Sequence, residues 1–138
     1  MARSKRKGPR PKTYAQLKSR LDAVFSIWTR RRFADENGMV RCITCQRLSH
    51  WKDLHAGHFI ARHHLAGRWL PENVHPQCPA DNLFRKGAYP EYAAWGVNHY
   101  GQSWLTDMVA LKRQSVKWSR TDLAQMVEDY TARVEAMG

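Results

Sequence analysis

The chain has 138 residues, and its 23 lysines and arginines outnumber its 12 aspartates and glutamates, which gives a formal net charge of +11. An excess this large on a small chain points to a polyanionic partner, a nucleic acid in the first place and an anionic membrane surface in the second. Hydrophobic residues make up 43% of the chain, and its apolar stretches fall far short of the roughly 20 residues of a membrane span, which excludes a disordered basic tail and a membrane-spanning protein.

Residues 1–12 read MARSKRKGPRPK, in which six positions are lysine or arginine. Such a segment cannot bury a core, so we expect a flexible basic arm. Its candidates for contact with DNA phosphates are Lys5, Arg6 and Lys7. A solubilising tail that makes no DNA contact is the alternative.

An amphipathic helix is expected over residues 13–37. Thr13 and Gln16 have the spacing of a capping box at its start, and the pair Asn37-Gly38 is typical of a helix C-terminus. Apolar residues recur at intervals of three and four, which places them on one face of the helix, and the opposite face is basic and open to solvent or DNA. The apolar positions are Tyr14, Leu17, Leu21, Val24, Phe25 and Trp28.

The central segment, residues 38–99, is expected to form the functional core, and residues 100–138 to add helices to the same domain. Glycines and prolines divide the central segment into short elements. The expected elements are a strand from Val40 to Ile43, an extended stretch over 56–60, short helices over 81–86 and 90–95, and longer helices over 102–113 and 120–137.

The three cysteines are spaced like metal ligands. Cys42 and Cys45 form a C-x-x-C pair, and Cys78 follows after 32 intervening residues. Asp81 stands where a second C-x-x-C pair would have its partner. Two such pairs can hold one tetrahedral zinc ion, and a carboxylate can take the place of one thiolate, so the spacing predicts a structural zinc site in a reducing compartment. Three unrelated cysteines or a redox pair are the alternatives.

Most of the seven histidines lie between Cys45 and Cys78. A neutral imidazole can deprotonate water near pH 7, while a divalent ion held by oxygen ligands stabilises the leaving oxygen of a phosphodiester. Asn82 follows the second half-site directly and offers such an oxygen. The segment therefore indicates nuclease chemistry, with His50 and His75 as alternative fourth ligands of the zinc.

These motifs together resemble the NinG/Rap recombination proteins of lambdoid phages. The shared order is C-x-x-C, AGHF, RW-x-x-x-N-V-H-x-Q-C and a final Asn, and the resemblance covers roughly residues 13–137. That family belongs with the HNH, or ββα-metal, nucleases, like the phage endonuclease VII group. The resemblance implies an α+β fold, namely a ββα-metal (HNH-like) finger stapled by a zinc site and flanked by an N-terminal helix and C-terminal helices.

The resemblance also implies roles for individual residues. His58 of AGHF stands at the position of the general base, Asn73 at that of the residue that braces the loop and orients the base, and Asn82 at that of the ligand of a catalytic Mg²⁺ or Mn²⁺. The structural zinc ligands implied by the resemblance are Cys42, Cys45 and Cys78.

Two positions depart from the family's pattern. Asp81 replaces the usual fourth cysteine, and Gly57 precedes His58 where many HNH enzymes carry an aspartate that binds the catalytic metal. Either Asn82 holds the ion together with water and phosphate oxygens, or a nearby side chain such as His55 assists. Because Mg²⁺ keeps several waters readily, a sparse protein shell is acceptable.

The implied function is a structure-selective DNA endonuclease that cleaves Holliday junctions and other branched intermediates such as D-loops. We expect it to be encoded by a phage or prophage and to act as a homodimer in the cytoplasm of a bacterial host cell. No membrane partner is expected. The alternatives are a general or sequence-specific HNH nicking endonuclease and a non-catalytic zinc-finger protein that binds branched DNA. Phosphate contacts, or merely solvated charges, are expected at Arg62, Arg68, Arg85 and Lys86.

Overall fold

The computed structural model describes residues 12–138, so Lys5, Arg6 and Lys7 of the expected arm lie outside the described residues. Within this range the chain forms a mixed α+β fold, as expected, and none of its helices is both long and apolar enough to cross a membrane. The elements in chain order are α1 (Tyr14–Arg31), β1 (Met39–Arg41), β2 (Leu48–His50), η1 (Trp51–Asp53), β3 (His55–His58), α2 (Leu65–Arg68), η2 (Pro71–Asn73), β4 (Val74–Gln77), η3 (Ala80–Phe84), α3 (Tyr89–Tyr100), α4 (Gln102–Ala110), η4 (Leu111–Arg113) and α5 (Arg120–Glu135).

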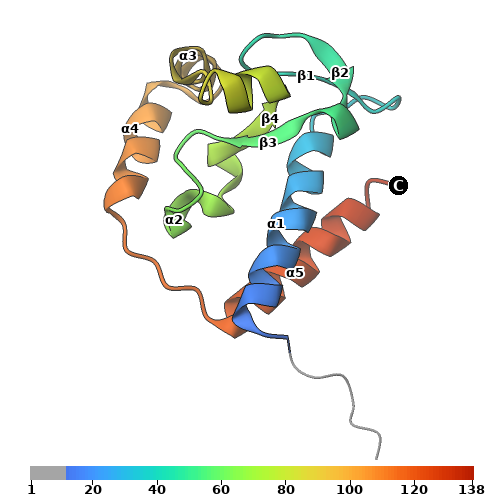
Figure 1. Cartoon of the computed structure of the whole chain (residues 1–138), viewed down its shortest axis with the longest axis vertical. Coiled ribbons are helices and arrows are strands. Elements are labelled where there is room, and N and C mark those ends of the chain that lie inside the picture. The colour runs from blue at the N-terminus through green and yellow to red at the C-terminus, as the bar shows by residue number, and fades with distance from the viewer. Residues whose placement is uncertain (1–11) are drawn as a thin grey trace, which may run out of the picture.

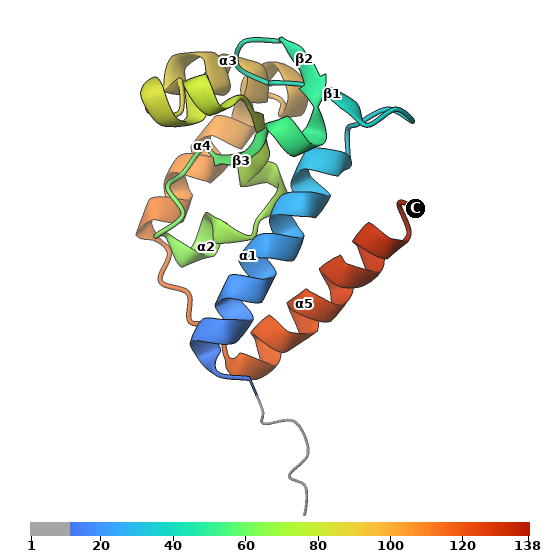
Figure 2. The same ribbon diagram turned by 45° about the vertical axis from the view of Figure 1, so that its right-hand side comes forward.

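Helices α1 and α5 lie side by side and begin at the same end of the molecule (Figures 1 and 2). The expected capping box at Thr13 is confirmed, because its hydroxyl accepts the Gln16 N–H at 3.1 Å and the Gln16 side chain accepts the Thr13 N–H at 2.9 Å. Ser119 and Asp122 form the same reciprocal pair at the start of α5. Each helix therefore begins with its free N–H groups satisfied by its own sequence.

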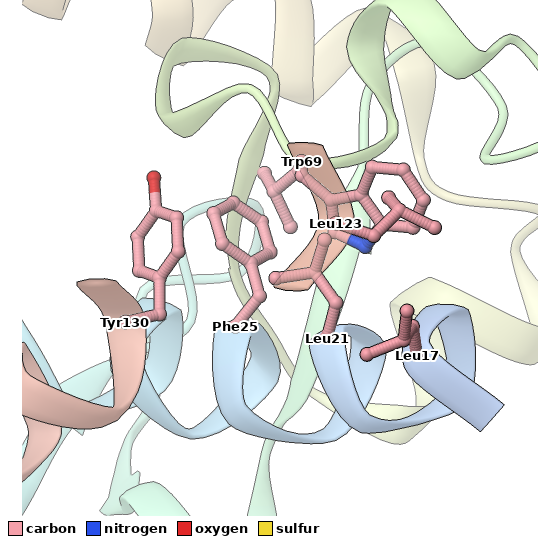
Figure 3. Close-up of a cluster of buried hydrophobic side chains, with 7 residues drawn as sticks. Leu17, Leu21, Phe25, Trp69, Leu123 and Tyr130 are labelled. Carbon is pink, nitrogen blue, oxygen red and sulfur yellow. The ribbon is translucent and has the colours of Figure 1, made fainter. Parts of the chain in front are cut away.

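A hydrophobic cluster joins the two helices to β4. Figure 3 shows Leu17, Leu21 and Phe25 along one side of α1, with Trp69 and Leu123 beside them. Since burial of one large apolar side chain contributes about 1.5–3 kcal/mol, this cluster supplies most of the attachment of α5. Its buried members are Leu17, Leu21, Phe25, Trp69, Val74, Leu123 and Tyr130.

Strands β3 and β4 pair in antiparallel register, with His55 opposite Gln77 and His58 opposite Val74, and strands β1 and β2 form a second, separate hairpin. Helix α1 packs against both β3 and β4, and α4 with the loop after β3 closes the other side (Figure 1). A second hydrophobic cluster joins α4 to this loop. Its buried members are Ile43, Phe59, Ile60, Tyr92, Trp104, Met108 and Leu111.

Helix α1 ends at Arg31, earlier than the expected range of 13–37. The reason is a polar turn, in which the Asp35 carboxylate accepts the N–H groups of Asn37 and Met39, each at 2.9 Å. Gly38 adopts a φ of +78°, and an added Cβ there would overlap His50. The side chain satisfies the turn's N–H groups locally, so the backbone gains nothing by staying helical.

The other elements differ from expectation mainly in their ends. The extended stretch expected over 56–60 is β3, and the helix expected over 81–86 is the short π-helical turn η3. Helix α3 is longer than the expected 90–95. Its Gly96 lies against the Trp104 ring of α4, where an added Cβ would overlap the indole, so this glycine permits the close packing of α3 on α4.

His75 is a fully buried core residue of β4 and not a zinc ligand. Its Nδ1 lies 2.9 Å from the Tyr92 hydroxyl and its Nε2 lies 2.7 Å from the Tyr100 hydroxyl. The Tyr92 O–H donates to the Gly57 carbonyl, so Nδ1 carries the proton and Nε2 accepts from Tyr100. Burial lowers the pKa of His75 to about 2, and the charge of Arg32 acts in the same direction.

The pKa of His75 predicts a loss of stability in acid. An unfolded imidazole binds a proton below pH 6.5, whereas folded His75 stays neutral down to about pH 2, so the free energy of unfolding should fall as the pH decreases from 6.5. One proton contributes up to about 1.4 kcal/mol per pH unit. Urea unfolding between about pH 7.5 and about pH 5 should show this slope, and His75→Gln should reduce it. The exposed control His63→Gln should keep it, and an unchanged slope in His75→Gln would contradict the assignment.

Candidate active site and metal centre

Three of the predicted site residues lie on one continuous unit made of β3, β4 and η3. His58 is the last residue of β3, Asn73 directly precedes β4, and Asn82 lies in η3, which follows β4. The strand register places His58 opposite Val74, next to Asn73. The antiparallel pair thus brings the start and the end of the intervening loop to the same place.

His58 is held in one orientation by a backbone carbonyl. Its Nε2 lies 2.8 Å from the carbonyl oxygen of Arg68. A carbonyl only accepts, so Nε2 carries the hydrogen, and in the neutral ring the lone pair is on Nδ1. Burial lowers the pKa of His58 below its usual 6.5, the hydrogen bond to Arg68 acts against this, and the charges of Arg62 and Arg68 lower the pKa further. At pH 7 the residue is therefore a neutral imidazole with a free basic nitrogen.

Asn73 closes the loop that follows β3. Its Oδ1 accepts the Ile60 N–H at 2.8 Å, and its Nδ2 donates to the carbonyls of Ile60 at 3.0 Å and Gly67 at 2.9 Å. Its own carbonyl accepts the Phe59 N–H at 2.9 Å. The side chain is fully buried, and an added Cβ on Gly67 would press on it. The Asn73 carboxamide therefore satisfies backbone groups of this loop that have no partner in a strand.

Arg68, a candidate DNA contact from the sequence, is largely buried and has a structural role. Its side chain is 8% exposed, and its Nη2 and Nε lie 2.6 Å and 3.0 Å from the two carboxylate oxygens of Asp22 in α1. Trp69 donates its indole N–H to the same carboxylate at 2.9 Å. The pair fixes the backbone of Arg68, whose carbonyl holds His58, so α1 orients the imidazole through two intermediates.

A cleft of about 350 Å³ opens beside His58 between α1 and β3. The side chains of His55 and His58 line it together, and the cations of Arg30, Lys52 and Arg62 stand around it. Arg62 is 64% exposed, and its one contact with Asp22 is long, at 3.4 Å. Its guanidinium therefore stays available to a ligand. A cleft with this excess of positively charged side chains suits a phosphate backbone.

Asn82 points at His55 across the gap between η3 and β3. The amide nitrogen of Asn82 lies 3.0 Å from Nδ1 of His55, which fixes the direction of both side chains. An ion here would take the amide oxygen of Asn82, and it would take Nδ1 of His55 once that nitrogen no longer accepts from the Asn82 amide. This donor set fits a divalent ion that keeps most of its waters. The structure thus places Asn82 beside His55, the residue that the sequence suggested as a second ligand of the catalytic ion.

Position 57 has no room for a metal-binding side chain. An added Cβ on Gly57 would overlap the side-chain oxygen of Gln77. The amide nitrogen of Gln77 donates to the Gly87 carbonyl at 2.8 Å and to the Thr44 hydroxyl at 3.2 Å, so its Oε1 is the atom turned toward Gly57. That oxygen is buried and has no hydrogen-bond partner. The Gln77 carboxamide thus fills the space beside position 57.

Cys42, Cys45, Cys78 and Asp81 come together at one point, as the sequence predicted. Their ligand atoms all lie within 4.8 Å of one another, which in residues 12–138 is the one such group of histidine, cysteine and acidic side chains. A regular tetrahedron with metal–sulfur bonds of 2.3 Å has edges of about 3.8 Å. The distances Cys45 Sγ–Cys78 Sγ and Cys42 Sγ–Asp81 Oδ2 are both 3.8 Å. The group fits a zinc ion, and His50 and His75 lie outside it.

The surroundings of Cys42 favour a thiolate. Burial raises the pKa of Cys42, but the Thr44 hydroxyl 3.2 Å from its sulfur and the hydrogen bonds from the backbone N–H groups of Cys78 and Cys45 outweigh it and hold the pKa below its usual value. Burial instead raises the pKa of Cys78 to about 11. The Cys78 thiol therefore stays protonated at neutral pH, and a bound zinc ion would favour its thiolate.

Arg85 and Lys86 follow η3 at the surface. Arg85 is 66% exposed and pairs with the Asp81 carboxylate, which is only 4% exposed. Lys86 is exposed and has a φ of +52°. Both cations can still reach a phosphate, although Arg85 shares its charge with Asp81.

Three functional residues have roles that the sequence does not predict, although Gln77 belongs to the motif N-V-H-x-Q-C. Asp22 lies on the polar face of α1, where a solvated charge is the ordinary expectation. Thr44 lies inside the C-x-x-C pair and donates to Asp81 at 2.6 Å. Gln77 directly precedes Cys78 and follows buried strand residues. Each of them acts on a partner far away in the sequence, which composition and periodicity do not register.

Comparison with known proteins gives one match. A protein-family model described as Bacteriophage Lambda NinG protein matches residues 2–138. No curated protein and no solved structure matches the chain. The family match therefore covers nearly the whole chain, including every candidate residue described above.

Removal of the Asp22 carboxylate should destabilise the protein. Asp22→Ala leaves the buried Arg68 guanidinium without its partner, and since Asp22 is 30% exposed we expect a loss of about 2 kcal/mol, less than for a fully buried pair. Urea unfolding measures it. The exposed α5 variant Glu128→Ala should change stability by less than about 0.5 kcal/mol. An equal, small change in both variants would contradict the role given to Asp22.

Asp81 should set the zinc affinity. Asp81→Cys completes a four-thiolate site and should raise the affinity, because thiolate is the softer ligand, whereas Asp81→Ala should lower it. Competition with a chromogenic chelator measures both variants, and Asp107→Ala, an exposed residue of α4, is the control. Zinc affinity that is equal in all four proteins would show that the cluster is not the zinc site.

Proposed function

Because the chain belongs to the NinG family of bacteriophage lambda proteins, we propose that it is a divalent-metal-dependent endonuclease that cleaves Holliday junctions and other branched recombination intermediates. The observation that carries the proposal is the state of His58. Its Nε2 is occupied by the Arg68 carbonyl, its Nδ1 is free, and it lines a basic cleft together with His55. A neutral, oriented base beside a phosphate-binding surface is what hydrolysis of a phosphodiester requires.

The order of the elements supports a ββα-metal (HNH-like) unit. His58 is the last residue of β3, Asn73 directly precedes β4, and Asn82 lies in the helical turn η3 that follows β4. The zinc site lies at the start of that turn, since Cys78 and Asp81 flank its first residues. Zinc would thereby hold η3 to the C-x-x-C turn and keep Asn82 in place opposite His55.

In the proposed reaction His58 takes a proton from water at Nδ1, and the resulting hydroxide attacks the phosphorus atom in line with the 3′-oxygen. The P–O3′ bond breaks, which leaves a 5′-phosphate and a 3′-oxyanion that takes up a proton from solvent to give the 3′-hydroxyl. The imidazolium that forms is stabilised by its Nε2–H bond to the Arg68 carbonyl. A Mg²⁺ or Mn²⁺ ion held by Asn82 and His55 would stabilise the charge on the phosphate and the leaving oxygen.

Surface cations supply the affinity for DNA. Arg30, Lys52 and Arg62 surround the cleft, and Arg85 and Lys86 follow η3. Each phosphate they neutralise lowers the logarithm of the affinity by about 0.9 per tenfold rise in salt. Charge of this kind does not distinguish a junction from a duplex, so the selectivity for branched DNA needs contacts other than those to phosphate.

Symmetric resolution of a four-way junction needs two active sites, so the proposed functional unit is a homodimer. Its mass would be twice the 16.1 kDa of one chain. The three free thiols fit a reducing compartment, here the cytoplasm of a bacterial host cell.

His58→Ala should abolish cleavage. We expect the rate on a four-way junction with Mg²⁺ or Mn²⁺ to fall by about 10²- to 10⁴-fold, because the general base is lost. His63→Ala, an exposed histidine of the same loop, is the matched control and should cleave normally. A panel of four-way junction, D-loop and linear duplex tests the substrate. Equal cutting of all three would select a general nicking enzyme, and tight junction binding without cutting would select a non-catalytic binding protein.

The pH profile provides an independent check on the base. Since the pKa of His58 lies below 6.5, the basic form persists at neutral pH, and the cleavage rate should fall only on the acid side of 6.5. If the rate falls during acidification before the pH reaches 6.5, the assignment of His58 as the base is wrong.

A further inference from the structure

The most exposed aromatic side chain of the described residues lies on the same short turn as Asn82. Phe84 is 84% exposed and Leu83 is 59% exposed, whereas Asp81 of the same turn is 3% exposed. Asp81 faces the cysteine cluster and Asn82 faces His55, so both polar side chains are directed inward. Two large apolar side chains are left at the surface of an element whose position is fixed at two points.

Basic residues follow this apolar tip directly. Arg85 is 66% exposed, and Lys86 after it is exposed as well. In Figure 1 this segment lies at one end of the molecule, next to α3 and the β1–β2 hairpin. An aromatic ring beside two cations matches a nucleic acid, in which a base offers a π face and the adjoining phosphates offer negative charge.

We propose that Phe84, with Leu83 beside it, stacks on a base at the branch point of DNA and thereby makes the protein selective for branched substrates. The inference rests on the proposed function, since it names the substrate feature that the site recognises. In a linear duplex such an insertion costs a few kcal/mol per unstacked step. At a branch point the stack opens more easily, so the same contact is gained at a lower cost.

The fixed position of η3 makes this contact useful for cleavage. Asn82 and Phe84 are two residues apart on one rigid turn, so a base held by Phe84 places a neighbouring phosphate at a defined distance from Asn82 and His58. The role of Phe84 is that of a specificity-determining residue, and it takes no part in the chemistry. Its loss should therefore change the choice of substrate more than the chemical step.

The test uses the full-length His58→Ala protein with Mg²⁺, in which the DNA stays intact. Adding Phe84→Ala should weaken binding to a four-way junction about tenfold and leave binding to a linear duplex of the same arm sequence within about twofold, since stacking on one base is lost. Phe84→Trp should preserve the junction preference. Leu48→Ala, an exposed apolar residue of β2, is the control and should also preserve it.

A second readout reports the base itself. With 2-aminopurine at the branch point, binding should raise the fluorescence as the base leaves its neighbours, and Phe84→Ala should remove the rise. A 2-aminopurine within an arm should show no change with either protein. The proposal is overturned if Phe84→Ala leaves both the junction preference and the fluorescence rise intact, or weakens both substrates equally.

Two other uses of the apolar tip would also overturn the proposal. If Phe84→Ala halves the mass in light scattering, the tip is a contact between copies of the chain, and if it removes binding to vesicles of anionic lipid, the tip is a membrane contact. Failure of the proposed function gives a different result. The protein with His58 intact would then not cut a junction, while the binding and fluorescence of the His58→Ala protein would still show the role of Phe84.

Discussion

The carboxamide of Asn73 is the contact on which the geometry of the candidate site depends. The loop after β3 has no strand ladder of its own, and this one buried side chain binds the backbone at Ile60 and at Gly67. It brings the chain back to pair with β3, and it keeps the Arg68 carbonyl within reach of His58. If these bonds are lost, the loop no longer holds a single conformation, and the His58 imidazole has no fixed direction.

Two attachments on opposite sides complete this arrangement. On one side the Asp22–Arg68 ion pair ties the loop to α1, whose apolar face packs on α5. On the other side the cluster of three cysteines and Asp81 joins the C-x-x-C turn to η3. Polar bonds and the cysteine cluster position the site, while the helices supply the bulk of the stability.

The sequence predicts the parts that rest on short spacing and leaves out those that rest on distant pairing. The capping box at Thr13 and the cluster around Asp81 follow from intervals of three residues, and the structure confirms both. The burial of Arg68 depends on Asp22, which lies 46 residues earlier, and an arginine between histidines gives no hint of it. The end of α1 was misplaced because a side chain, and not a helix breaker, terminates it.

The packing of Gly57 against Gln77 links the two positions in evolution and in engineering. An acidic side chain at position 57 and a glutamine at position 77 require the same volume, so neither change is tolerated without the other. A variant that restores an aspartate before His58 must also shorten residue 77, and in doing so it loses the bond from Gln77 to the Gly87 carbonyl beside η3. Related chains should therefore show the two positions changing as a pair, each viable only in its own combination.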